Sequence, residues 1–299
     1  MVELLKPIKK NWFAIVMAIP AFLYLIAFLV LILDRVTVLS LTYIAPDLTE
    51  TYPTLRNYIE LANRPEFWDT LKRTFFFTLV GTPLELLVGL VLAGLINKEF
   101  RGRGIFRSIF IIPVAIPGIV TAIIIWIISN YPFGHINDIL MGKYWFFPRI
   151  VSEPINWRGS AFAALTLSML GKVWRDMPIS MLILLSGLQA IGIDQYEAAQ
   201  TMGASPWQRF RYITIPLLLP AISTVLVLRS IEMWKEFIFP FVLAPRYPLL
   251  GTLIDDAYHL WNEPAVASAI SIILVICIGV STAFLFYSLN WLRKALVKI

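Results

Sequence analysis

The chain consists of long apolar stretches separated by short polar segments. A transmembrane helix needs about 20 consecutive, mostly apolar residues to cross the hydrocarbon core of a bilayer. Six stretches meet this requirement, at residues 13–33, 74–96, 105–128, 161–189, 217–243 and 266–289. The first is too long for the core of a typical signal peptide, and no small-residue cleavage site follows it, so we expect a membrane anchor. The pattern predicts an all-α membrane protein with six transmembrane helices.

Composition supports this class. Of the 299 residues, 59% are hydrophobic and 15% charged, whereas soluble domains are about 45–50% apolar and about 25% charged. The net charge of +6 is typical of basic loops in a membrane protein and is poor evidence for a nucleic-acid partner. One cysteine, Cys277, and two histidines leave few side chains for a metal site or a nucleophilic centre. We therefore expect membrane lipid as a partner, no bound cofactor or metal, and no catalytic residues.

Lysine and arginine are concentrated in alternate flanks of the six stretches, and such flanks face the cytoplasm. The residues concerned are Lys6, Lys9, Lys10, Lys98, Arg101, Arg103, Arg107, Arg209, Arg211, Arg293, Lys294 and Lys298. We therefore expect the chain to lie in the plasma membrane with both termini in the cytoplasm. Residues 34–73 would form an external loop and 190–216 a cytoplasmic one. No second domain is expected within 1–299.

The cytoplasmic loop contains the signals of two short capped helices. Asp194 can cap the first helix with Glu197 three residues later, and Gly203 can end it in the left-handed conformation. Ser205 and Gln208 form the same capping pattern for the second helix. From these residues alone, an amphipathic connector on the membrane surface explains the pattern as well as a docking element does.

Eight ionisable residues lie inside the predicted spans: Glu85, Lys172, Arg175, Asp176, Arg229, Glu232, Lys235 and Glu236. A charge in the membrane costs several kcal/mol unless it is paired or hydrated, so these side chains should face a cavity or one another. Spacing predicts two pairs, Lys172 with Asp176 and Arg229 with Glu232. Structural pairing, substrate contact and a proton relay remain alternatives.

Two tryptophans near these charges, Trp174 and Trp234, add to the substrate interpretation because aromatic faces suit sugar rings. Packing between helices or an interfacial aromatic belt is the alternative role for a tryptophan in a span. The candidates for a substrate path are Glu85, Lys172, Trp174, Arg175, Asp176, Glu232, Trp234, Lys235 and Glu236. An ion-coupled secondary transporter that uses the embedded carboxylates is the alternative function. A membrane-embedded enzyme is disfavoured, because no nucleophile–base or metal constellation is present.

The cytoplasmic loop resembles a family motif. Glu197, Ala198, Ala199 and Gly203, followed by Ile213, Ile215 and Pro216, have the spacing E-A-A-x3-G-x9-I-x-[LI]-P. This pattern is similar to the EAA loop of permease subunits in binding-protein-dependent ATP-binding-cassette (ABC) importers. Further similarity to the carbohydrate type, which includes maltose and glycerol-3-phosphate permeases, lies at residues 56–58, 67–74, 102–117, 174–178 and 187–189.

The resemblance implies a six-helix permease domain with the type I ABC importer fold, spanning residues 1–299. It implies that Glu197, Ala198, Ala199 and Gly203 couple the permease to a separate ATPase. Because the chain has no phosphate-binding loop, ATP and magnesium would bind to that partner chain. An extracellular solute-binding protein would deliver a sugar or related polar solute. Six helices make half of a pathway, so a second permease is implied, and a heterodimer is favoured over a homodimer.

Overall fold

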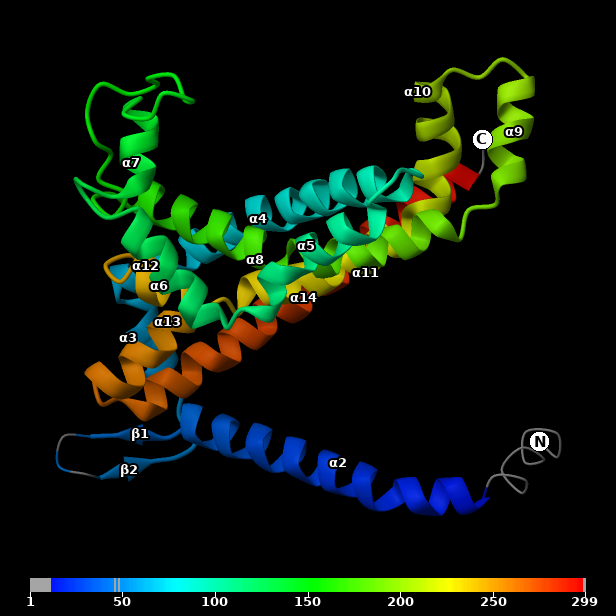
Figure 1. Ribbon diagram of the computed structural model, residues 1–299. Helices are drawn as coiled ribbons and strands as arrows, with labels where there is room; N and C mark the ends of the chain where they lie inside the picture. Colours follow the sequence, from blue (N-terminus) through cyan, green and yellow to red (C-terminus); the bar gives the residue numbers. More distant parts are fainter. Residues whose placement is uncertain (1–11, 46, 48, 298–299) are drawn as a thin grey trace. The chain divides into compact units, whose positions relative to one another are not determined.

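The computed structural model describes residues 12–45, 47 and 49–297, and these fall into two compact units (Figure 1). The first unit runs up to Arg64 and includes Asp256–Ile273. The second comprises Pro65–Asp255 and the residues from Leu274 onward. Each unit is described separately below.

The first unit joins one long helix to a small cap made of two short strands and short helical segments. It contains α2 (Trp12–Ser40), the strands β1 (Tyr43–Ile44) and β2 (Glu50–Thr51), α3 (Arg56–Ala62), the π-helical turn η2 (Asp256–Leu260) and the beginning of α14 (Pro264–Val297). The strands are antiparallel, with Tyr43 opposite Thr51.

A buried amide holds this cap together. The side chain of Asn57 in α3 donates to the carbonyl oxygens of Ser40 at 3.0 Å and Thr42 at 2.8 Å. Arg64 forms an ion pair with Glu263 at 2.8 Å. The Asn57 hydrogen bonds attach the segment after α2 to α3, since a buried amide that lost its acceptors would remain unsatisfied. The Arg64–Glu263 ion pair attaches the end of this region to the start of α14.

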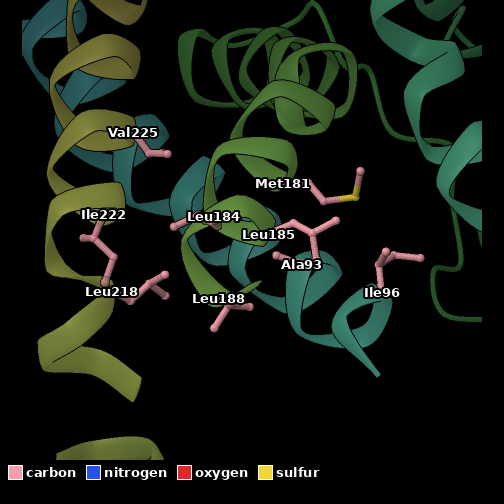
Figure 2. Packing of buried hydrophobic residues seen from close by; sticks show 9 residues of the cluster. All are labelled: Ala93, Ile96, Met181, Leu184, Leu185, Leu188, Leu218, Ile222 and Val225. Atoms are coloured by element: carbon pink, nitrogen blue, oxygen red, sulfur yellow. The ribbon is translucent and has the colours of Figure 1, made fainter. Parts of the chain in front are cut away.

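The second unit is a helical bundle. Its elements are α4 (Pro65–Asn97), α5 (Arg103–Ala115), α6 (Gly118–Ile128), α7 (His135–Leu140), α8 (Ala161–Gln189), α9 (Ile193–Thr201), α10 (Pro206–Arg209), η1 (Phe210–Thr214), α11 (Ile215–Trp234), α12 (Ile238–Leu243), α13 (Leu250–Asp255) and the remainder of α14. Helices α4, α8 and α11 pack together at its centre (Figure 2).

The central helices approach closely at two glycines. A Cβ atom on Gly89 would lie 2.9 Å from the Cβ of Ser180, and one on Gly187 would lie 2.7 Å from the Cβ of Ala221. Both contacts are shorter than van der Waals distance. Helices α4 and α8, and α8 and α11, can therefore pack at these distances only because the glycines have no side chain.

Length and hydropathy identify four unbroken candidate spans among the described residues, at Val16–Ser40, Pro65–Asn97, Pro206–Trp234 and Pro264–Lys294. Two bent helix pairs raise the number to six if each pair is one span. The pair α5 and α6 is bent by 94°, and α8 and α9 by 63°. The helical class is thus confirmed, and the predicted stretch 161–189 coincides with α8.

Two predicted stretches are not continuous helices. The stretch 105–128 breaks at Ile116, which is extended with φ −82° and ψ 130° because the next residue is Pro117. The stretch 217–243 breaks after Trp234, and the side chain of Glu236 accepts a hydrogen bond from the backbone N–H of Phe239 at the start of α12.

Both ends of the predicted external segment 34–73 are helical. Helix α2 extends to Ser40 and α4 begins at Pro65, so only residues 41–64 lie between the two spans. Polar residues at the ends of apolar stretches continue these helices, because a helix can extend past the hydrocarbon into the headgroup region.

Candidate functional site

The predicted cytoplasmic loop is a pair of short helices that projects from the end of α8 (Figure 1). Helix α9 carries Glu197, Ala198 and Ala199, and ends before Gly203. Gly203 has a φ of +81°, the left-handed conformation expected of a helix stop. The backbone N–H of Ala204 returns to the carbonyl oxygen of Ala199 at 2.9 Å.

One of the two predicted helix caps is present and the other is wrong. The hydroxyl of Ser205 accepts from the backbone N–H of Gln208, and the Gln208 side chain accepts from the N–H of Ser205 at 2.7 Å. Helix α9, however, begins at Ile193 with Gly192 as its N-cap, so Asp194 lies inside the first turn and caps nothing. Its charge still lies at the positive end of the helix dipole.

Side-chain contacts tie this helix pair to the membrane helices. The hydroxyls of Tyr196 and Thr214 are 3.0 Å apart, which joins α9 to the turn before α11. Arg209 donates to the side chain of Gln200 at 3.2 Å, which joins α10 to α9. The pair can therefore move as one piece with the start of α11.

The outward face of the pair is free and partly apolar. Glu197 and Ala198 are exposed, whereas Ala199 is buried against the pair itself. Met202 is 81% exposed and Trp207 66%. Exposed apolar side chains beside a carboxylate are typical of a surface that a protein partner covers.

A buried hydrophobic cluster lies directly behind the helix pair. Figure 2 shows its members, contributed by α4, α8 and α11: Ala93, Ile96, Met181, Leu184, Leu185, Leu188, Leu218, Ile222 and Val225. Leu188 precedes α9 by a few residues, and Leu218 follows η1. A close-packed interior transmits displacement instead of absorbing it, so movement of the helix pair would shift these three helices.

A first charge network joins the same three helices nearer their middle. The guanidinium of Arg229 in α11 lies 2.8 Å from the carboxylate of Glu85 in α4, and both side chains are at most 1% exposed. Ser180 of α8 donates to Glu85 at 3.0 Å and accepts from Arg229 at 2.9 Å. Arg229 also pairs with Glu232, as predicted from their spacing.

A second network lies on α8. The ammonium of Lys172 is 2.8 Å from Asp176, the predicted pair, and 2.9 Å from Glu236 beyond the end of α11. Arg175 contacts the other oxygen of Asp176 at 2.6 Å. Since Lys172, Asp176 and Glu236 are all buried, each charge is compensated by another protein group.

The remaining candidates differ in exposure. Trp174 is 44% exposed, and Lys235 is exposed without an ion pair within the part of the chain described. Trp234 is only 4% exposed, and its indole N–H has no hydrogen-bond partner among the described residues. Four of the candidates are thus buried in ion pairs: Glu85, Lys172, Asp176 and Glu236. Arg175 and Glu232 are paired but partly exposed. Trp174 and Lys235 are exposed, and Trp234 is buried without an ion pair.

Sequence reasoning missed the contacts between helices. The pairs Arg229–Glu85 and Lys172–Glu236 join residues far apart in the chain, and Ser180 was not considered at all. The sequence does show embedded charges of opposite sign, which indicates that ion pairs exist, but this signal does not identify which helices are neighbours. Within the described residues, no group of three or more His, Cys, Asp or Glu side chains is arranged to hold a metal ion.

Comparison with known proteins gives the family. Residues 85–298 match the family described as "Binding-protein-dependent transport system inner membrane component". The trehalose/maltose transport system permease protein MalF of Thermococcus litoralis is 35% identical over 228 residues, 75% of each chain. The inner membrane ABC transporter permease protein YcjO of Escherichia coli is 32% identical over 237 residues, 78% of each chain.

Solved structures agree with the fold. A chain of a bacterial alginate ABC transporter, in complex with alginate pentasaccharide-bound periplasmic protein, superposes with a TM-score of 0.81 at 19% identity, covering 97% of this chain and 98% of that one.

The family match and the permease relatives place this multi-helix bundle among the transport permeases. The chain belongs to the family of binding-protein-dependent transport system inner membrane components, as the EAA resemblance predicted. It is the membrane subunit of an ABC importer, and ATP hydrolysis belongs to a separate chain.

Proposed function

We propose that this chain forms half of a translocation path for a sugar or a related polar solute, delivered by an extracellular binding protein. The printed names of its relatives support the solute class: one is a trehalose/maltose permease and another, of Agrobacterium fabrum, a sulfoquinovosyl glycerol permease that is 34% identical over 199 residues. The observation that carries the importer mechanism is the exposed helix pair α9–α10, rigidly joined to the central bundle.

Coupling to ATP follows from this geometry. An ATPase subunit would dock on Glu197, Ala198, Ala199 and Gly203, where small residues permit close approach of the backbone. Closure of the ATPase around nucleotide would displace the pair, and the cluster behind it would tilt α4, α8 and α11. Such a change needs nucleotide to favour one of two conformations, which is the general requirement for ligand-driven switching.

The embedded charges are assigned to two roles. The buried residues Glu85, Lys172, Asp176 and Glu236 hold the helices in register, and the buried Trp234 packs near the ring of Phe75 in α4. The more open residues Trp174, Arg175, Glu232 and Lys235 line the path of the solute. The assignment rests on exposure: Trp174 and Lys235 are exposed, and the side chains of Arg175 and Glu232 remain 29% and 31% exposed beside their ion pairs, so a solute could reach them.

The ion-coupled alternative has less support. A proton carrier needs an embedded carboxylate that can change partners, yet each of Glu85, Asp176, Glu232 and Glu236 lies within ion-pair distance of a Lys or Arg.

Two further expectations concern the orientation of the chain and its partners in the full assembly. Six spans with both termini in the cytoplasm place the helix pair on the cytoplasmic side, where an ATPase with bound ATP and magnesium would be found. Half of a pathway needs a second permease, and we propose a heterodimer in the plasma membrane. The two bent helix pairs would each count as one of the six spans.

The test is charge reversal at the proposed docking surface. Glu197→Lys should leave insertion into the membrane intact while ATP-driven solute uptake is lost, because a lysine would meet the ATPase where a carboxylate is expected. Glu99→Lys is the matched control: it reverses an exposed carboxylate in the loop between α4 and α5, and should retain uptake. Normal uptake by the Glu197 variant would contradict the docking assignment.

A further inference from the structure

A cavity of about 290 Å³ lies in the second unit, at the end opposite α9 and α10 (Figure 1). Three segments enclose it: residues 129–131 after α6, residues 156–159 before α8, and residues 243–247 at the end of α12. Its size is close to the lower limit of about 300 Å³ for small-molecule sites, which suits a single ring-sized ligand.

The walls are held by specific hydrogen bonds. The indole N–H of Trp157 donates to the side-chain oxygen of Asn137 at 3.1 Å. Asn137 is fully buried and also exchanges hydrogen bonds with the backbone of Ile155, both at 3.1 Å. On the other side, the hydroxyl of Tyr247 donates to the carbonyl oxygen of Gly159 at 3.3 Å. The cavity is therefore preformed, which lowers the entropy cost of binding.

The cavity carries positive charge without a compensating carboxylate. Arg158 and Arg246 line it, and none of its described lining residues is Asp or Glu. Arg246 is exposed and forms no ion pair in the described part of the chain, while Arg158 lies over the ring of Trp126 at 5.8 Å. Both guanidinium groups are free to bind an anion, and their planar donors match a carboxylate or a similar oxyanion.

The remaining lining side chains suit a sugar ring. Trp157 and Tyr131 contribute aromatic side chains to the lining, as does Tyr247, whose ring also has Arg73 over it at 5.7 Å. Asn130 and Asn156 contribute amide groups that can bind hydroxyls. A purely inorganic anion would need no aromatic faces, and a neutral sugar would leave the two arginines without a counter-ion. Aromatic side chains, amides and two guanidinium groups in one lining match a sugar that bears an acidic group.

We propose that this cavity is an outer subsite for an anionic sugar residue, which the solute occupies before it enters the membrane. The outward position rests on the proposed function and its topology. The ligand chemistry rests on the cavity itself. The subsite would add selectivity for a carboxylate- or phosphate-bearing hexose over its neutral counterpart.

Titration calorimetry on the full transporter complex, purified without ATP, tests the proposal. The probes are glucuronate, galacturonate and glucose 6-phosphate, with glucose as the neutral match. We expect at least one anionic probe to bind at least tenfold more tightly than glucose. Arg246→Gln and Arg158→Gln should each weaken that binding at least tenfold, whereas Arg101→Gln, an exposed arginine between α4 and α5, should not change it.

The proposal is overturned if none of the three anionic probes binds more tightly than glucose, or if binding is unaffected by both cavity substitutions. It is also overturned if the substitutions weaken only the docking of the solute-binding protein, because the cavity would then receive an acidic protein side chain. ATP-driven uptake by the unmodified complex tests the proposed function separately, so uptake without anionic-sugar binding would reject the subsite alone.

Discussion

The pair formed by Arg229 and Glu85 allows a structural role to be separated from a substrate role. Glu85 has one cationic partner, at 2.8 Å, whereas Arg229 has two anionic partners, Glu85 and Glu232. Removing the arginine leaves a carboxylate that is 0% exposed without a counter-charge, but removing the carboxylate leaves the arginine with one ion pair. The two single substitutions should therefore differ in cost.

Loss of one partner from a buried ion pair costs about 3–5 kcal/mol, and we expect this for Arg229→Met. Glu85→Gln should cost about 1.5–3 kcal/mol, the value for a lost hydrogen bond to a charged group. The double variant should be more stable than Arg229→Met alone, because the fully buried carboxylate no longer lacks a counter-charge; Glu232 also loses its partner, but its side chain is 31% exposed to solvent. Arg56→Met, which breaks the exposed pair with Glu60, should cost below about 1 kcal/mol.

The assay is reversible unfolding in mixed detergent–SDS micelles, followed by tryptophan fluorescence, with solute uptake measured in parallel. If the pair only fixes helix register, the double variant should recover uptake together with stability. Recovery of stability without uptake would mean that Arg229 or Glu85 contacts the solute. A cost below about 1 kcal/mol for Arg229→Met, equal to the Arg56 control, would refute the reasoning altogether.

Three further predictions concern close packing and the helix pair. Gly187→Ala should lower the free energy of unfolding by about 1–3 kcal/mol in the same unfolding assay, and Ala221→Gly should partly restore it. Gly94→Ala is the control and should be neutral, because a Cβ at Gly94 meets nothing within 4 Å. Gly203→Ala should cost about 1–2 kcal/mol because of its positive φ, measured as faster proteolysis of the loop. Ser205→Ala should remove a cap worth about 0.5–2 kcal/mol, measured as faster amide exchange at the start of α10.

Features set by neighbouring residues could be predicted from sequence. The Ser205–Gln208 cap, the left-handed Gly203 and the Lys172–Asp176 pair each depend on residues at most four apart. The bend at Pro117 was missed because hydropathy alone continues without interruption across it, although a proline restricts the backbone of the residue before it. Local chemistry was therefore a better guide than the length of an apolar run.

Features that join distant segments could not be predicted. Nothing in a single sequence says that Glu85 faces Arg229, or that Lys172 faces Glu236, because the choice depends on which helices pack together. The same holds for the cavity near Trp157, whose three walls come from separate loops. The embedded charges indicated that each needs a partner of opposite charge, but only the packing of the helices determines which residues pair.

The break between α5 and α6 has an evolutionary consequence. A helix break leaves backbone groups without intrahelical partners, and the guanidinium of Arg175 donates to the carbonyl oxygen of Ile116 there, at 3.4 Å. Asp176 in turn holds Arg175. We expect Pro117, Arg175 and Asp176 to be inherited together among homologues. In lineages that lose the proline, and with it the bend, the arginine should no longer be conserved, because the carbonyl group that it binds would have a partner within the helix.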